Sequence, residues 1–536
     1  MNRVVGDPRR RSGRRWRSIA AALVVAAVGM ALVAACSNSE SGDQAGVTPT
    51  TIRSDDDPAS DDPASGDSTS GDSTSDDPAE PPDDDRTALD ATVPPADDPP
   101  VCELATPTTS TTVTVWHSLG GTQTVEAIDE IVDAFVAVHP EIDIEIVATQ
   151  GYDNALRLFR DTPPDELPDL FMTSIDSARL LAESGGFVPP QVCSGESPAV
   201  LDDLLPVIRG TLTIDDVLWA YPFNVSTPVL VYDPSLLAEL DLELDPDGPP
   251  VGLDELRDIA AALAESELAP GGLVLYDRSA SWLVEQWAVH HDHVLVEPDN
   301  GRRGHPVDGV RFATDEAVAA LEWARDLHDD ELVSWVGLNQ SGIDDLLKLI
   351  DLSDRAAFTM HTSASIGELV ELVYGGGLAD LDGAELGVAP IPSPGATEGS
   401  LVGGGALWLR DGGDPVAVGA AALLAEHVMG PASQATFAAA TGYVPATVSA
   451  AEHPVTVARW EEFPQFGVGY RQLAGQGASP SETGMQIGPR VVVQRVLEAA
   501  AADVIVNGAD ARSRLGAAED EALELIRRYE LDGTEE

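Results

Sequence analysis

Residues 219–233, Trp219-Ala-Tyr-Pro-Phe-Asn-Val-Ser-Thr-Pro-Val-Leu-Val-Tyr-Asp233, place small polar residues and two prolines in the middle of an apolar run. Val, Leu, Tyr and Phe at this density indicate buried strand. Proline interrupts a strand because it cannot donate to the hydrogen-bond ladder. The stretch therefore predicts two strands separated by a break. The role of the break depends on the fold of the flanking sequence.

Strand and helix patterns alternate on both sides of this stretch. Before it, residues 112–118, 142–146 and 168–174 have strand patterns, and helical patterns lie between them. After it, helices are predicted near 253–265, 315–328, 343–350, 415–429, 432–440, 490–504 and 513–530, and strands near 272–276, 356–361, 386–390 and 401–409. This alternation predicts an α/β fold with a largely parallel sheet. About 420 ordered residues exceed the usual single core, so we expect two α/β lobes.

The N-terminus has the order of an export signal. Seven arginines precede an uncharged Ala/Val/Leu run, which ends at Val33-Ala-Ala-Cys36. This order predicts a signal peptide over residues 1–35. Small residues before a cysteine resemble the bacterial lipobox, so we predict that Cys36 is lipidated and anchors the protein to the outer face of the cytoplasmic membrane. A transmembrane anchor, or a secretory peptide with a chance cysteine, is the alternative. Arg14-Arg15 leaves open whether export is general secretory or twin-arginine.

Residues 36–110 contain the lipidated cysteine and then an acidic linker. From Ser37 to Ala105 there are 19 acidic residues and two arginines, mixed with Pro, Ser, Thr and Gly. Such a segment has too few apolar side chains to fold, and its charges repel one another. We predict a disordered stalk. The net charge of the whole chain is −61, which disfavours nucleic acid as a partner.

Two cysteines remain besides Cys36. Disulfides persist in exported proteins, so Cys102 and Cys193 are candidates for a bridge. The sequence does not show whether the two residues lie within reach of each other. Neither has the spacing of a metal site, and no metal is predicted.

Catalytic motifs are incomplete. Residues 363–367 lack the first glycine of a nucleophile elbow, and Gly403-Gly-Gly405 lacks the lysine that follows in a phosphate-binding loop. The histidines within residues 290–293 would point in different directions on a helix, so a solvated face is favoured over a metal site. We therefore predict neither enzyme activity nor a cofactor.

Six aromatic residues lie at predicted strand ends or in loops, a placement common in concave sites that bind polyols. They are Trp116, Tyr152, Tyr221, Trp282, Trp408 and Tyr443. Taken singly, each is more often a core residue than a ligand contact. As a set they favour a polyol site.

Ordered motifs across the chain resemble those of one protein family. They are Trp116-His-Ser-Leu-Gly-Gly121, Tyr152-Asp-Asn-Ala-Leu156, Pro222-Phe-Asn-Val-Ser-Thr-Pro-Val-Leu-Val-Tyr232, Gly403-Gly-Gly-Ala-Leu-Trp408, Thr441-Gly-Tyr-Val-Pro445 and Gly488-Pro-Arg490. From about Val113 to Tyr529, the chain is similar to the extracellular solute-binding proteins of carbohydrate-type ABC importers. Within that family it most resembles the glycerol-3-phosphate and glycerophosphodiester binders.

The resemblance implies a two-lobe α/β fold of the periplasmic-binding-protein type (type II), with ligand bound between lobes that close about a hinge. It implies a first lobe of residues 111–225 and 386–430, and a second lobe of residues 226–385 and 431–536. The break at Pro222–Pro228 is then the point where the chain crosses between lobes. Whether Asn224 serves the hinge or contacts the ligand stays open.

Eight positions match ligand-binding positions of the family. They are Tyr152, Asp176, Ser226, Trp282, Thr362, Gly404, Tyr443 and Arg490. The resemblance implies ring faces and hydroxyls from the tyrosines, and a hydroxyl acceptor at Asp176, where the family has Glu. It implies hydroxyls at Ser226 and Thr362, and close backbone approach at Gly404.

Arg490 matches the arginine of the family's phosphate site, and a guanidinium pairs phosphate bidentately. The alternative is a surface arginine that starts a helix. The family's loop at residues 276–282 has a second tryptophan where this chain has Ser279. That difference implies a narrower aromatic wall and room for a larger ligand, such as glycerophosphocholine.

The function implied by the resemblance is capture of a polyol phosphate or related saccharide by a monomeric, lipid-anchored receptor that delivers it to membrane permease subunits. A binder of neutral oligosaccharides, with Arg490 structural, is the alternative. A secreted hydrolase of glycerophosphodiesters and a scaffold with a vestigial cleft are the rivals from other classes.

Overall fold

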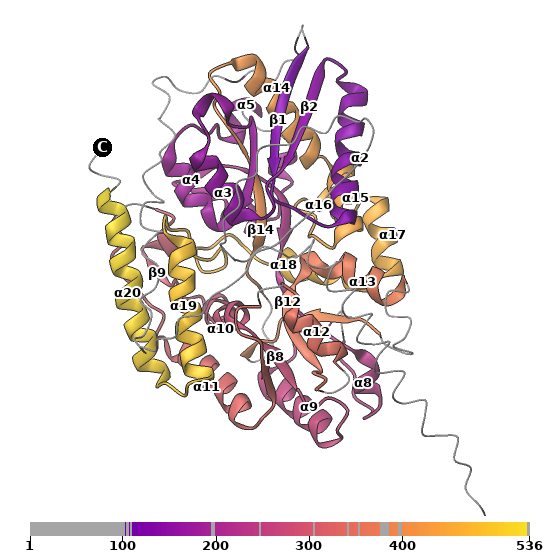
Figure 1. The fold of residues 1–536 in the computed structure, drawn as a ribbon, viewed down its shortest axis with the longest axis vertical. Coiled ribbons are helices and arrows are strands. Elements are labelled where there is room, and N and C mark those ends of the chain that lie inside the picture. Colours follow the sequence, from indigo (N-terminus) through magenta and orange to yellow (C-terminus); the bar gives the residue numbers. More distant parts are fainter. Residues whose placement is uncertain are drawn as a thin grey trace, which may run out of the picture.

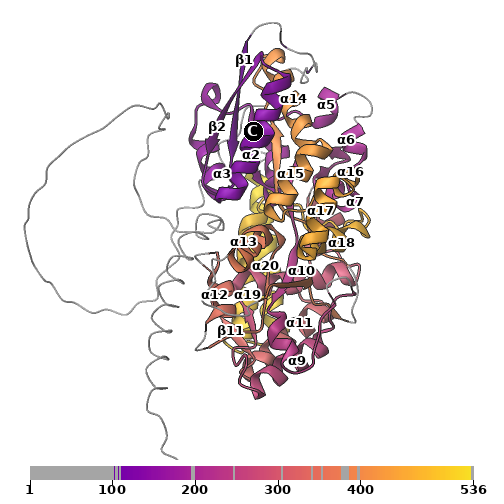
Figure 2. The ribbon, with the colours of Figure 1, turned by 90° about the vertical axis from the view of Figure 1, so that its right-hand side faces the viewer.

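The computed structural model describes residues 102, 107, 110–194, 199–245, 248–303, 306–339, 342–351, 354–375, 385–394 and 399–532. The predicted signal peptide, the lipidation site Cys36 and nearly all of the predicted linker lie outside these residues. Figure 1 shows two α/β lobes stacked along the long axis, and Figure 2 shows the same stacking from the side. The fold is therefore the two-lobe α/β arrangement that was predicted.

The upper lobe in Figure 1 is built on a sheet with the strand order β2-β1-β3-β14-β6 among the described residues. The strands are β1 (Thr111–His117), β2 (Ile142–Ala148), β3 (Leu170–Ser174), β6 (Tyr221–Ser226) and β14 (Gly403–Leu409). β1 is parallel to β2 and β3, whereas β14 is antiparallel to β3 and β6. A short hairpin, β4 (Thr213–Ile214) and β5 (Val217–Leu218), precedes β6.

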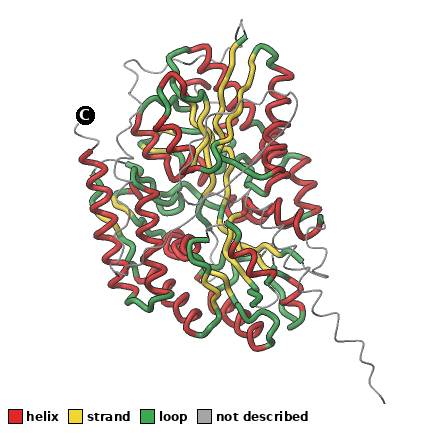
Figure 3. Tube along the Cα trace, in the orientation of Figure 1, coloured by secondary structure: helices red, strands yellow, loops and turns green. Residues whose placement is uncertain are grey.

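Helices surround this sheet, as Figure 3 shows. They are α2 (Thr122–Val138), α3 (Tyr152–Asp161), α4 (Ala178–Ser184), α5 (Pro190–Ser194), α6 (Ala199–Asp202), α7 (Pro206–Thr211), α14 (Pro415–Met429), α15 (Pro431–Thr441), α16 (Val448–Ala451) and α17 (Pro454–Glu462). The next helix, α18 (Val468–Ala474), packs against strands of the second sheet. No single helix in the described part of the chain has the length and apolar composition to cross a membrane. α14 and α15 pass that test only as a pair, bent by 59°.

The lower lobe has a second sheet with the order β11-β8-β12-β7-β13. Its strands are β7 (Pro228–Tyr232), β8 (Leu273–Leu275), β11 (Val333–Trp335), β12 (Phe358–Thr362) and β13 (Gly387–Pro390), and β9 (Val296–Glu297) pairs with β10 (Gly309–Val310) nearby. Its helices are α8 (Pro234–Ala238), α9 (Leu253–Glu265), α10 (Asp277–His290), α11 (Asp315–Asp329), α12 (Asp344–Ile350), α13 (Ile366–Tyr374), α19 (Arg490–Ile505) and α20 (Ala511–Asp532).

The sequence of β7 is apolar along its whole length because both faces of the strand are buried. Leu230 and Tyr232 pack into one core cluster, while Val229 and Val231 pack into a separate cluster on the other face. Alternate residues of a strand point to opposite faces, so a strand covered on both sides is apolar throughout.

The break in residues 219–233 is the crossing point between the two sheets. β6 belongs to the first sheet, β7 to the second, and Thr227 lies between them. The Thr227 hydroxyl is 2.9 Å from Ser400 Oγ and donates to the Leu401 carbonyl at 2.8 Å, which ties it to the segment leading into β14. Pro222 lies where the register between β6 and β14 shifts, a position that tolerates the missing N–H. The prolines therefore suit a crossing strand.

The placement of two elements differs from the predicted lobe division. β13 pairs with β7, so residues 387–390 belong to the second sheet rather than to the first lobe. Phe437 of α15 packs into the core of the first lobe, although residues from 431 onward were assigned to the second. Both segments lie close to crossings, where the sequence pattern gives no sign of which sheet a strand joins.

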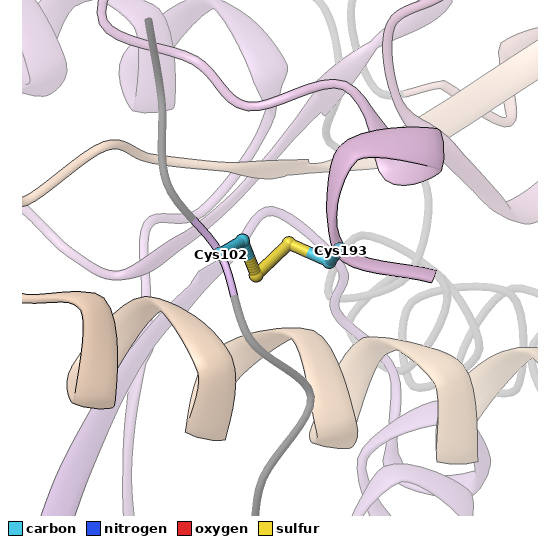
Figure 4. The surroundings of a disulfide bond; sticks show 2 residues. All are labelled: Cys102 and Cys193. Carbon is cyan, nitrogen blue, oxygen red and sulfur yellow. A yellow bond between two sulfur atoms is a disulfide. The ribbon is translucent and has the colours of Figure 1, made fainter. Parts of the chain in front are cut away.

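A disulfide bond joins Cys102 to Cys193 (Figure 4). Cys193 lies in α5 and is part of the buried core of the first lobe. The bond therefore fixes the described residue Cys102, at the end of the predicted linker, to the globular part.

Candidate ligand-binding cleft

A cavity of about 340 Å³ lies between the two lobes and is lined by residues of both. All eight residues named from the resemblance line it: Tyr152, Asp176, Ser226, Trp282, Thr362, Gly404, Tyr443 and Arg490. They are far apart in the sequence, and the fold brings them together at strand ends and helix starts. The cleft therefore combines aromatic rings, hydroxyls and charged groups in one space.

Two tyrosines of the cleft come from the first lobe, Tyr152 at the start of α3 and Tyr443 in the loop after α15. Tyr152 is the first residue of α3, and its hydroxyl accepts a hydrogen bond from Asn224 Nδ2 at 2.5 Å. Burial and then the neighbouring Tyr443 raise the pKa of Tyr152 well above its usual range. Tyr443 stacks on Phe437, with ring centroids 5.3 Å apart. Asn224 is fully buried, so its role is to hold Tyr152 in place rather than to contact a ligand.

Gly404 is required by the neighbouring strand. Its φ is +94°, and a Cβ at this position would lie 2.0 Å from the carbonyl oxygen of Asn224 on β6. The resemblance implied that the missing side chain opens the backbone to a ligand. The structure gives a second reason for the glycine, the close approach of β6 and β14, and Gly404 also lines the cleft.

Ser226 and Thr362 lie at the crossing-side ends of their strands. Ser226 ends β6 and is almost fully buried at the cleft wall. Thr362 ends β12 and caps the following 3-10 turn, η6 (Ser363–Ser365), by accepting from the Ala364 N–H at 3.3 Å. The Thr362 hydroxyl is thus positioned by the turn that follows its strand.

Arg490 begins α19 and is only 7% exposed, so it is not a surface residue. One terminal nitrogen of its guanidinium donates to Glu285 Oε1 at 2.5 Å, and the other donates to Gln494 Oε1 at 2.6 Å. Asp176 Oδ1 lies 3.7 Å from its Nε. The arginine is at the predicted place, but its charge is already paired. Glu285, 3% exposed on α10, was missed because only the fold brings it to Arg490.

Residues 276–282, expected as a loop, form the start of α10. The backbone N–H of Tyr276 donates to Ser279 Oγ at 2.9 Å, which caps the helix. Ser279 is fully buried and is not part of the cleft wall, so the inference that it widens the cleft is wrong. Trp282 does line the cleft, packed edge-on against Tyr276 with ring centroids 6.1 Å apart.

Three of the six aromatic residues proposed for the site are core residues instead. Trp116, Tyr221 and Trp408 lie in the buried cluster of the first lobe. All three are on strands of the first sheet, where the alternation of side chains turns them under the covering helices. Only Tyr152, Trp282 and Tyr443 of the set face the cleft.

Charged residues are numerous on the cleft wall, and the arginines among them are paired. Arg278 lies 2.5 Å from Glu498, and Arg495 lies 3.9 Å from Asp153. Behind the wall, Arg302 is buried and donates to the backbone carbonyls of Thr211 and Gly484. Burial, together with the nearby Arg490, lowers the pKa of Arg302 to about 9.

A buried network supports the β12 side of the cleft. Asp345 Oδ2 is 2.9 Å from His361 Nδ1, and His361 Nε2 is 3.0 Å from Ser365 Oγ. Asp345 also accepts from Thr359 and Asn339. Burial alone would raise the pKa of Asp345, but His361 and these donors hold it below the usual value. The order Asp–His–Ser is that of a hydrolase triad. Here Asp345 is fully buried, His361 and Ser365 line the cavity, and the network fixes the turn that follows Thr362.

Two sheets joined by crossing strands, with a polar cleft between the lobes, define a two-lobe binding protein. The family model described as "Bacterial extracellular solute-binding protein" matches residues 130–465. The chain belongs to this family. Its members are solute-binding proteins of ABC importers rather than enzymes, and they act outside the cytoplasm.

Curated relatives include the sn-glycerol-3-phosphate-binding periplasmic protein UgpB of Salmonella typhimurium. It is 23% identical over 432 residues, which cover 78% of this chain and 93% of the relative. UgpB of Escherichia coli K12 is 24% identical over 434 residues, with the same coverage of both chains.

Solved structures with the same fold include two with different ligands. UgpB from Mycobacterium tuberculosis, in complex with glycerophosphocholine, has a TM-score of 0.62 at 17% identity and covers 79% of this chain and all of its own. The GacH receptor of Streptomyces glaucescens, described unliganded and with acarbose, has a TM-score of 0.60 at 19% identity, covering 78% and 98%. At these identities the structures show the fold alone.

Proposed function

We propose that this solute-binding protein captures glycerol-3-phosphate, a glycerophosphodiester or a related saccharide and delivers it to the permease of an ABC importer. The observation that carries the proposal is Arg490, a buried arginine on the wall of a cleft that also presents Tyr152, Ser226 and Tyr443. The hydroxyls would bind the polyol, and the guanidinium would bind the phosphate. The curated relatives named as glycerol-3-phosphate binders support the same ligand class.

A neutral saccharide is the second candidate, and one observation favours it. The fork of Arg490 is already engaged by Glu285 and Gln494. A phosphate would have to displace or share these partners, whereas a neutral ligand would leave the pair intact. Acarbose, present in the GacH structure, is a ligand of the saccharide class.

Capture would proceed by closure of the lobes around the ligand. The crossing at Thr227 and the segment near Ser400 would act as the hinge, because the chain passes between the two sheets there. Ligand shifts the equilibrium only if the closed state binds it more tightly than the open state. Lipidation at Cys36 would hold a monomeric receptor near its permease, with the acidic linker as the stalk.

A thermal-shift screen tests the ligand class. The exported chain is heated with sn-glycerol-3-phosphate, glycerophosphoglycerol or maltose, each at millimolar concentration. A ligand that binds only the folded state stabilises it by RT ln(1 + L/Kd), where L is the free ligand concentration, so the melting temperature rises with the ratio of L to Kd. We expect a rise with the phosphate esters. A rise with maltose alone would favour the second candidate, and no rise with any ligand would overturn the proposal.

A further inference from the structure

Glu368 is a cleft residue that neither the sequence nor the resemblance singles out. It lies on α13, in the second lobe, and lines the same cavity as Arg490. Its Oε2 atom is buried and makes no hydrogen bond with the described residues. A buried carboxylate oxygen without a donor is costly, which suggests that its partner arrives with the ligand.

The charge balance of the cleft wall supports this view. Its three arginines, Arg278, Arg490 and Arg495, each have a carboxylate partner among the described residues. Glu368 has no ion pair there, and neither has the cleft residue Asp277. The wall therefore carries two carboxyl groups, Glu368 and Asp277, that no basic side chain among the described residues pairs with.

Glu368 and Arg490 line the cavity from two different helices, α13 and α19. Figure 1 shows α13 on the right of the molecule and α19 on the left, with the ends of the central strands between them. An extended ligand can thus reach both helices with different chemical groups. Trp282, on α10, also lines the cavity and adds an aromatic surface that can hold a cation.

We propose that Glu368 forms a subsite for a positively charged group of the ligand, a quaternary or primary ammonium. This inference rests on the proposed function, because it adds an ammonium group to the polyol phosphate. The ligand would then be a zwitterionic phosphodiester, with its phosphate at Arg490 and its ammonium at Glu368. A zwitterion brings no net charge, so it suits a cleft whose arginines are already paired.

The ionisation behaviour of Glu368 agrees with a cation subsite. Burial raises its pKa from 4.5 to about 7. A cation beside the carboxylate would favour its charged form and lower that pKa again. Ligand binding would thus release part of a proton near neutral pH.

Titration calorimetry of the full chain with two matched diesters tests the subsite. Glycerophosphocholine and glycerophosphoglycerol share the glycerol and the phosphodiester, and only the first carries an ammonium. For Glu368→Gln we expect about a tenfold or larger loss of affinity for glycerophosphocholine and less than about a twofold change for glycerophosphoglycerol. Glu371→Gln, an exposed change on the same helix, is the control and should alter neither affinity.

The outcomes separate the subsite from the function on which it rests. Equal effects of Glu368→Gln on both diesters, or none on either, would overturn the subsite and leave the polyol-phosphate function standing. Wild-type protein that binds neither diester would overturn the proposed function itself. Circular dichroism of each variant shows whether it is folded, and the retained binding of glycerophosphoglycerol is a second check.

Discussion

Arg490 and Glu285 form a buried ion pair of 2.5 Å in the wall of the cleft. The two residues are 205 positions apart in the sequence. Their charges cancel where a phosphate would bind, so the ion pair makes the binding of an anion less favourable. A ligand phosphate has to compete with the Glu285 carboxylate for the same guanidinium.

Glu285→Gln is expected to release Arg490 for the ligand. The change leaves a buried cation without its closest carboxylate partner, so we predict a loss of about 3 kcal/mol in the free energy of unfolding without ligand. The freed guanidinium should bind sn-glycerol-3-phosphate about tenfold more tightly, with maltose unchanged. Calorimetry and urea denaturation measure the two effects. If the variant binds both ligands as the wild type does, Arg490 does not contact the ligand.

The pH dependence of stability should show the raised pKa of Glu368. Its carboxyl has a pKa of about 7 in the folded protein, against 4.5 as the ordinary value. Between these pH values the folded state holds the proton more tightly than the unfolded state. The contribution of Glu368 to the free energy of unfolding therefore falls as pH rises from about 4.5 to 7.

In the Glu368→Gln variant the side chain cannot ionise, so the free energy of unfolding does not fall with pH in this way. The variant should therefore exceed the wild type in stability by up to about 3 kcal/mol at pH 8, with little difference at pH 4. Urea denaturation at both pH values measures the difference. A constant difference across the range would show that burial does not perturb Glu368.

Asp345→Asn should destabilise the second lobe. The buried carboxylate pairs with His361 and accepts from Thr359, so its loss is expected to cost about 3 kcal/mol. Because the pKa of Asp345 is lowered, the stabilisation is present above its ordinary value of 3.8 and is lost as pH falls below it. Asp344→Asn on the same helix is the control. Equal stability of the two variants at pH 7 would contradict the role of the network.

Cys193→Ser should lower the free energy of unfolding, because the unfolded chain without the disulfide has more conformational entropy. The disulfide closes a loop with a sequence separation of 91 residues. Loop-closure entropy for a loop of this size corresponds to about 4 to 5 kcal/mol. Denaturation of the variant, and of wild type with and without reductant, measures the loss. Reductant should have no further effect on the variant, and an unchanged wild type under reduction would contradict the estimate.

Much of the fold could be predicted because local patterns agree with it. The helix predicted at 253–265 is α9, and the one predicted at 415–429 is α14. α10 was missed because its polar residues Ser279, Ser281, Glu285 and Gln286 are buried together with its apolar ones, so its sequence does not separate an apolar face from an exposed polar one. Helix periodicity is visible only where one face meets water.

The site could be predicted only in part, for a related reason. Tyr152 and Arg490 were found through motifs that surround them in the sequence. Glu285 and Glu368 have no such motif, and their roles depend on which distant side chains are nearby. The prediction that Trp408 belongs to the site was wrong because strand alternation does not reveal which face of a sheet is covered by helices.

Calorimetry with a charge-balanced variant tests the central claim most directly. Arg490→Gln combined with Glu285→Gln removes both charges, so no unpaired buried charge remains. Wild-type protein is titrated with glycerophosphoglycerol and with maltose, and the double variant with the same two ligands. We predict that wild type binds the diester and that the double variant binds it at least about a hundredfold more weakly. Undiminished diester binding by the double variant, or binding of maltose alone by the wild type, would contradict the account.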